Sequence, residues 1–197
     1  MSAPHGAAPA AAAPGAVEDK GWRSRALFWG PVLPLVALDL WSKAWAFARL
    51  DTLYPGAPVA EESVWTGFIS FSLVKWTNTG TVWGLGQGMT IPLIVLRCCA
   101  LVLLAWFARR TPVTNRIQLL VLGLILSGAI GNLYDNFTQP QRAVRDFLLF
   151  FHGQGVDRIV FPAFNVADSC ITVGAIGLFF LLLREDRASA ARKPAVS

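Results

Sequence analysis

Three aspartates lie close together along this sequence, at or between the ends of two apolar segments. Asp135 lies near the end of one segment, Asp168 near the start of the next, and Asp146 between them. Two carboxyl groups a few ångström apart cannot both be ionised, so they share a proton. The ionised group can accept a proton from water while the protonated group donates to a carbonyl oxygen. This is the chemistry of peptide hydrolysis without a metal or a nucleophilic side chain.

Other common hydrolytic sites have no counterpart in the sequence. It contains neither an HExxH zinc motif nor a GxSxG nucleophile motif, and His5 and His152 are isolated. No metal and no cofactor are therefore expected. Acids inside membrane segments also serve proton relays and ion pathways. The residues alone leave two functions open, a hydrolase and a small proton- or ion-translocating membrane protein.

The composition is that of an integral membrane protein. Hydrophobic residues make up 54% of the 197 residues and charged residues only 15%, against about 25% charged in a soluble domain. The mean hydropathy is +0.50. The net charge of +5 comes from basic residues at the ends of apolar runs, without a basic stripe that interleaves aromatics. Nucleic acid is therefore excluded as a partner.

Four apolar runs predict an α-helical integral membrane protein with four transmembrane helices. Each run is close to the ~20 residues that a helix needs to cross a bilayer. The predicted spans are residues 26–48, 90–108, 117–137 and 163–183, within a membrane domain of residues 26–184. An Ala/Pro/Gly-rich tail at residues 1–25 is predicted to be disordered, and residues 185–197 form a second tail.

Basic residues indicate the orientation in the membrane. Ten Lys and Arg residues flank the spans on the side of the two termini, and five occupy the much longer segments on the other side. The positive-inside rule then places both termini in the cytoplasm. Segments 49–89 and 138–162 are predicted to face outward.

The first outward segment has the composition of a small β-element. Residues 68–76, FISFSLVKW, are rich in aromatic and β-branched residues and predict a strand. Residues 78–80 predict a turn, followed by a short strand through Trp83. An outward β-element lying on the membrane is expected between the first two spans.

Several charged residues interrupt the predicted spans. Asp39 and Lys43 are four residues apart on one helix, a spacing that predicts a mutual ion pair. Arg97 stands alone in the second span, where snorkelling to the interface or contact with water is expected.

Small residues recur every four positions in the third span. Gly123, Ser127 and Gly131 form a stripe that lets another helix approach closely, and Asp135 continues the same stripe. At 1.5 Å per residue, Asp135 lies about 27 Å from Ile117, at the outer boundary of the membrane.

Four strings at these positions resemble the lipoprotein signal peptidases, also called signal peptidase II. The two strongest are GAIGNLYDN (Gly128 to Asn136) and FPAFNVADSCITVG (Phe161 to Gly174). NTGTVWGL, from Asn78, and DLWSK, from Asp39 to Lys43, are weaker. Their order and spacing match that family over the whole chain except its tails.

The resemblance implies a bacterial inner-membrane aspartic endopeptidase with four spans, cytoplasmic termini and an active site at the outer face. Such enzymes remove the signal peptide of a prolipoprotein, cleaving amino-terminal to a diacylglyceryl-modified cysteine. The implied partners are lipid-modified prolipoproteins and membrane lipid, with no cofactor and no metal.

The resemblance also implies roles for individual residues. Asp146 and Asp168 would be the catalytic pair. Four residues would line the cleft and bind the substrate backbone, namely Asn78, Gly80, Asn132 and Asn165. Three residues would support the site, namely Asp135, Asp39 and Lys43. The outward β-element would be a cradle under the substrate, and the loop near Asp146 its lid.

Two departures from the family pattern fall between the motifs. Asn136 stands where the family usually has an Arg directly after the aspartate, and residues 139–141 look like an insertion. The first leaves open whether Arg142 or Arg145 supplies the missing cation. The second leaves open whether Asp146 or Asp135 is the partner of Asp168. An inactive homologue that binds lipidated peptides without cleaving them is also consistent with Asn136.

Overall fold

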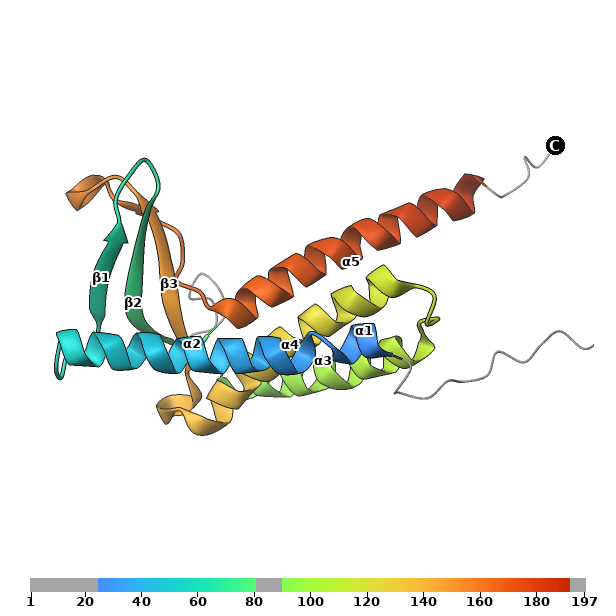
Figure 1. Cartoon of the computed structure of the whole chain (residues 1–197), viewed down its shortest axis with the longest axis horizontal. Helices are drawn as coiled ribbons and strands as arrows, with labels where there is room; N and C mark the ends of the chain where they lie inside the picture. Colours follow the sequence, from blue (N-terminus) through green and yellow to red (C-terminus); the bar gives the residue numbers. More distant parts are fainter. Residues whose placement is uncertain (1–24, 81–89, 192–197) are drawn as a thin grey trace, which may run out of the picture.

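The computed structural model describes residues 25–80 and 90–191 as a mostly helical protein with one small antiparallel sheet (Figure 1). In chain order its elements are α1 (Ala26–Trp29), α2 (Val32–Leu53), β1 (Ala60–Trp65), β2 (Ser70–Asn78), α3 (Thr90–Arg110), α4 (Arg116–Thr138), β3 (Val144–His152), β4 (Ile159–Val160) and α5 (Val166–Ala191), with two short 3-10 turns at Pro140–Arg142 and Gly155–Asp157. The predicted strand through Trp83 and most of the predicted disordered tail lie outside the described residues. Helix α5 continues to Ala191, beyond the predicted end of the span at residue 183.

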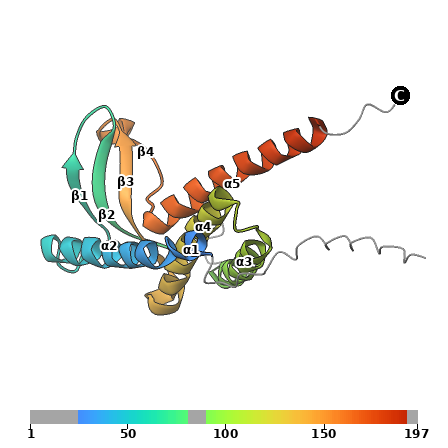
Figure 2. The same ribbon diagram turned by 45° about the vertical axis from the view of Figure 1, so that its right-hand side comes forward.

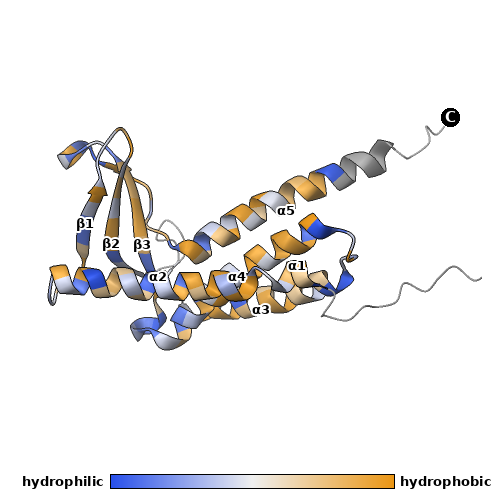
Figure 3. Cartoon of the chain, in the orientation of Figure 1, coloured by the Kyte–Doolittle hydropathy of each residue, from blue (hydrophilic) through white to orange (hydrophobic). Residues whose placement is uncertain are grey.

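Among the described residues, three helices are long and apolar enough to cross a membrane. They span Thr90–Arg110, Arg116–Thr138 and Val166–Arg184, with mean hydropathies of 2.4, 1.8 and 2.1. Their apolar character is visible along α3 and α4 in Figure 3. The prediction of a helical membrane protein with a small β-element is thus confirmed, and three of the predicted spans agree with these helices.

The first predicted span, residues 26–48, is divided into two helices. Helix α1 ends at Trp29, and α2 begins only after Pro31, whose nitrogen carries no hydrogen to continue the α-helical bonding. Helix α2 then carries Asp39 and Lys43 in its middle and Arg49 near its end. Helix α2 differs from the three apolar helices above because it carries these charges, and it begins only at Val32.

Helix α4 lies at the centre and contacts all four other helices. Its predicted small-residue stripe faces α1 and α2. A β-carbon on Gly123 would lie 2.4 Å from the carbonyl oxygen of Phe28, and one on Gly131 would lie 2.5 Å from Asp39 Oδ2. The predicted close approach is therefore confirmed. A second close approach was not predicted, in which Gly128 faces the backbone of α5 at Ala167.

Gly131→Ala is expected to displace the Asp39 carboxylate, because the added methyl group would overlap it. Asp39 is completely buried, so it has no space into which to retreat. We expect a loss of about 1–3 kcal/mol in the free energy of unfolding, as for other overpacked interiors. Thermal unfolding in detergent measures this loss, with Gly177→Ala as the control, since its added β-carbon would meet only the tip of the Val121 side chain. An unchanged melting temperature for Gly131→Ala would show that the predicted overlap is relieved at no cost.

The sheet has the order β1-β2-β3-β4, and all neighbouring strands are antiparallel. It stands over the carboxyl-terminal half of α2 (Figure 2). Its two central strands come from different segments between the helices, with Trp76 of β2 opposite Asp146 of β3. The sequence predicted only the strand that corresponds to β2. The sheet therefore extends beyond the segment between the first two spans, and Asp146 lies on a strand rather than in a loop.

Two apolar clusters position the elements around the polar centre. One joins α1, α2, α3 and α4 and includes Phe28, Leu119 and Leu122. The other joins the outer end of α2 to the sheet and includes Leu50 and Phe147. Since Phe147 follows Asp146 directly, its burial against α2 fixes the register of β3. Asp146 then points to the opposite face of the strand from Phe147, where Asn165, just before α5, donates a hydrogen bond to its carboxyl group.

Candidate functional site

A buried ion cluster connects α2, α4 and β3. Lys43 Nζ lies 2.7 Å from Asp39 Oδ2 and 3.2 Å from Asp135 Oδ2. Asp135 Oδ1 also accepts hydrogen bonds from Arg145 Nε at 3.2 Å and Nη2 at 2.7 Å. The Lys43, Asp39 and Asp135 side chains are completely buried. Two acids and two cations therefore meet in this cluster, and both cations contact Asp135. The predicted Asp39–Lys43 ion pair is confirmed.

The start of α5 places Asp168 beside this cluster. Asn165 precedes the first residue of the helix, and its Oδ1 accepts a hydrogen bond from the backbone nitrogen of Asp168 at 2.8 Å. Asp168 Oδ2 in turn accepts one from the backbone nitrogen of Asn165 at 3.2 Å. This is a reciprocal cap, in which each side chain satisfies a backbone donor at the helix end. A further donor, the backbone nitrogen of Ala167, bonds Asp39 Oδ1 at 2.8 Å.

Two asparagine side chains link the acids to one another. Asn165 Nδ2 donates to Asp146 Oδ1 at 2.7 Å, so Asn165 bonds both Asp146 and Asp168. Asn132 Nδ2 donates to Asp168 Oδ1 at 2.7 Å, and Asn132 Oδ1 accepts from Lys43 Nζ at 3.0 Å. The structure therefore brings Asp146 and Asp168 together around Asn165.

Asp146 is 2% exposed and takes part in no ion pair within the described part of the chain. Burial, and next the charge of Asp168, raise the pKa of the Asp146 carboxyl to about 8. Hydrogen bonds from Asn78 and Asn165 and the charge of Lys43 act in the opposite direction and are outweighed. Asp146 therefore holds a proton at neutral pH.

The asparagines predicted to bind substrate lie at the acids. Asn78 hydrogen-bonds Asp146, and its Oδ1 also accepts from the backbone nitrogen of Gly80 at 2.9 Å. Asn132 and Asn165 use their side-chain donors on the acids and on the backbone oxygen of Arg145. Their role as substrate-binding residues stays a prediction.

The cation beside Asn136 is neither Arg142 nor Arg145, the two candidates from the sequence. It comes from helix α3. Arg145 is occupied by Asp135, and Arg142 contributes its backbone oxygen, which accepts a hydrogen bond from Asn136 Nδ2 at 2.6 Å. The guanidinium beside Asn136 is that of Arg97, whose Nη1 donates to Asn136 Oδ1. The sequence did contain a signal for this contact, because an arginine within an apolar span needs a polar partner.

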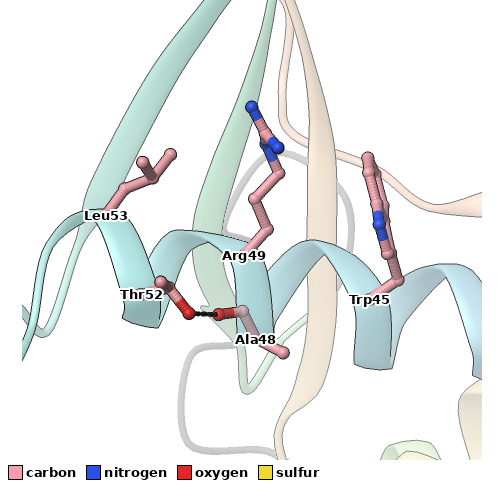
Figure 4. A pocket seen from close by; sticks show the side chains of 5 residues that line it. All are labelled: Trp45, Ala48, Arg49, Thr52 and Leu53. Carbon is pink, nitrogen blue, oxygen red and sulfur yellow. Dashed lines mark hydrogen bonds between the residues drawn. The ribbon is translucent and has the colours of Figure 1, made fainter.

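A hollow of about 480 Å³ lies between α2 and the sheet, beside the acids rather than over them. Its walls include Trp45 and Arg49 of α2 and Phe147 and Leu148 of β3. A second hollow shares Trp45 and Arg49 and extends along the helix to Leu53. Figure 4 shows these three side chains on the same side of α2. The chain therefore offers a mostly apolar surface next to Asp146.

No group of three or more His, Cys, Asp or Glu side chains in residues 25–80 and 90–184 is arranged to hold a metal ion. A helical membrane protein with a buried and a half-buried aspartate joined through one asparagine is the class that this fold and site define, the class of membrane-bound aspartic peptidases. A family model described as Signal peptidase (SPase) II matches residues 32–184 of the chain. The chain belongs to this signal peptidase II family, the lipoprotein signal peptidases.

Individual relatives agree with this assignment. The lipoprotein signal peptidase of Deinococcus radiodurans is 33% identical over 159 residues, which cover 79% of this chain and 78% of that protein. The lipoprotein signal peptidase of Clostridium tetani is 34% identical over 152 residues, covering 77% and 88%. A solved structure described as "Bacterial membrane enzyme structure by the in meso method at 2.3 A resolution" has the same fold. Its TM-score is 0.65 at 24% identity, covering 89% of this chain and 94% of that chain.

Proposed function

We propose that this aspartic endopeptidase removes signal peptides from prolipoproteins, cleaving amino-terminal to a diacylglyceryl-modified cysteine, with Asp146 and Asp168 as its catalytic pair. The observation that carries the assignment is the link between the two carboxyl groups through Asn165. Membership of the signal peptidase II family favours this function over proton or ion translocation.

The ion cluster favours Asp146 over Asp135 as the partner of Asp168. Both oxygens of Asp135 are engaged within the ion cluster, by Lys43 and by the backbone and guanidinium of Arg145. Asp146 lacks such cations and holds a proton at neutral pH, because burial and Asp168 raise its pKa to about 8.

The proposed mechanism assigns opposite roles to the two acids. Asp168 accepts hydrogen bonds on both oxygens, from Asn132 and from the backbone of Asn165, which support its charged form. It takes a proton from a water molecule as the water oxygen attacks the scissile carbonyl carbon. Asp146 donates its proton to the carbonyl oxygen, which gives a neutral diol. Collapse of the diol breaks the C–N bond, with one proton passing to the leaving amine and one returning to the pair.

We further propose that residues 26–184 form a peptidase domain with four spans, in which α2 is the additional span. The two charges in the middle of α2, Asp39 and Lys43, are completely buried and paired, so they do not face lipid. Exposed Leu33 and Trp41 supply apolar surface on the other side of this helix. The basic residues at the span ends support cytoplasmic termini in the bacterial inner membrane, with the acids at the outer face and the sheet as a cradle for substrate.

Cleavage of a lipid-modified precursor tests the function. The purified full chain in detergent is incubated with a synthetic precursor peptide carrying a diacylglyceryl cysteine and with the same peptide unmodified. We expect cleavage of the modified peptide only, with a lipidated cysteine as the new amino terminus by mass spectrometry. Binding of the modified peptide without turnover would identify an inactive homologue instead. Proton flux in vesicles without cleavage would indicate a translocating protein.

A further inference from the structure

Arg97 places a positive charge inside an apolar helix. It lies seven residues after Thr90, the start of α3, or about 10 Å along the helix axis. It is half-buried, and the side chain is directed to α4, where Nη1 donates to Asn136 Oδ1. A charged arginine at this depth is costly unless polar groups surround it. Asn136 is a neutral partner, so this bond alone does not balance the charge.

Charge balance connects Arg97 to the acid pair. The inner cluster already contains two acids and two cations. In the proposed mechanism Asp146 is protonated and Asp168 is ionised, so the pair carries one negative charge. The charge of Arg97 acts on both acids, although it forms no ion pair with either of them within the described residues. Arg97 thus lies within electrostatic reach of the acid pair without bonding it directly.

Asn136 holds the guanidinium in place from the other side. Its side chain is 2% exposed, and its Nδ2 donates to the backbone oxygen of Arg142 at 2.6 Å. Both hydrogen-bonding ends of the Asn136 amide are therefore used, and its oxygen is directed at Arg97. An arginine has five N–H donors in a planar fork. Among the described residues one Arg97 nitrogen is bonded, to Asn136, which leaves donors for a substrate bound beside the acids.

We propose that Arg97, held by Asn136, is a substrate-positioning residue that donates hydrogen bonds to a main-chain carbonyl oxygen of the bound precursor. This inference rests on the proposed function, since the ligand is the lipid-modified precursor peptide. The alternative role is snorkelling, in which Arg97 only carries its charge toward the interface. A snorkelling side chain would not contribute to precursor binding.

Kinetics of Arg97→Gln separate these roles. A lost charge-assisted hydrogen bond to substrate predicts a fall in kcat/KM on the order of 10- to 100-fold, with most of it in KM. Arg110→Gln is the matched control, because it removes a cation from the exposed far end of the same helix. It is expected to cleave at the wild-type rate. Melting temperatures in detergent show that each variant is folded.

The second test moves the cation from α3 to α4. Arg97→Ala empties the space beside residue 136. A second substitution, Asn136→Arg, then returns a guanidinium to that space. We expect the double variant to recover at least about tenfold in kcat/KM over Arg97→Ala, because the position of the cation matters and not the helix that carries it. Affinity for the lipidated peptide, measured without turnover in an Asp168→Asn background, should fall with Arg97→Gln.

Three results would overturn the inference. They are a wild-type KM for Arg97→Gln, a folded double variant that recovers nothing, and an unchanged peptide affinity. Failure of the proposed function gives a different result, since the wild-type chain itself would then not cleave the lipidated precursor.

Discussion

Asp168→Asn is expected to abolish cleavage of a lipidated precursor, with kcat reduced about 10³-fold or more. Asp168 is the proposed base, and an amide cannot take a proton from the attacking water. Loss of an acid–base group costs about 10²- to 10⁴-fold, and groups that act as a unit lie at the upper end. Single-turnover cleavage of the diacylglyceryl peptide measures the effect. Asp157→Asn is the matched control, since it removes an exposed acid from the outward segment.

The same substitution is expected to lower stability. Both Asp168 oxygens accept hydrogen bonds, one from Asn132 Nδ2 and one from the backbone nitrogen of Asn165. An asparagine offers one oxygen and one NH2 group, so one donor would face another donor. Asn132 cannot resolve this by turning over, because its oxygen is bonded to Lys43. Peptide binding and gel filtration distinguish a folded, inactive variant from an unfolded one. A folded variant with normal turnover would remove Asp168 from the mechanism.

Asp146→Asn is expected to abolish cleavage to a similar extent while the protein still folds. The variant has no proton to give to the scissile carbonyl oxygen. Its amide oxygen can still accept the hydrogen bond from Asn165, and its NH2 group resembles a protonated carboxyl group. If Asp146→Asn processed the precursor at the normal rate, the pairing would be wrong, and Asp135→Asn would be the next variant to assay.

The pH dependence of stability has a defined sign at Asp146. Its carboxyl group has a pKa of about 8 in the folded chain, against the ordinary value of 3.8. Between these values the folded state holds a proton that the unfolded state has released. The contribution of this group to stability is therefore complete below the ordinary value and is lost as the pH rises toward 8. Asp168, Lys43 and Arg97 are the charged groups that act on it, and they are present in the variant as well.

Melting curves across this window test the assignment of the raised pKa. We expect the wild-type melting temperature in detergent to fall between pH 5 and pH 8.5. The Asp146→Asn variant should fall less, with a difference on the order of 5 °C at the higher pH. Parallel curves for the two proteins would contradict a raised pKa at Asp146.

The helices were largely predictable from the sequence, because the thickness of a bilayer sets the length of an apolar span. The predicted spans 90–108 and 117–137 agree with α3 and α4 to within about two residues. Gly123 and Gly131 were recognised as a packing stripe from their spacing alone. The sheet was predicted only in part, because β2 and β3 pair residues such as Trp76 and Asp146 that are distant in the sequence. Local pattern contains little information on such a pairing.

The sequence by itself determined the family. Aspartates at the ends of apolar segments left hydrolysis and proton or ion translocation open, and the strings around Asp135 and Asp168 carried the resemblance to signal peptidase II that decided between them. These conclusions depend on residue type and spacing within one element, which the sequence displays directly.

Only the tertiary structure decided how the three aspartates differ. Lys43 reaches Asp135 from α2, and Arg145 reaches it from the strand that also carries Asp146. The two cations contact Asp135, while Asp146 and Asp168 meet at Asn165 with no cation bonded to either among the described residues. The protonation state of a carboxyl group depends on charges within a few ångström, and these come from elements far apart along the chain.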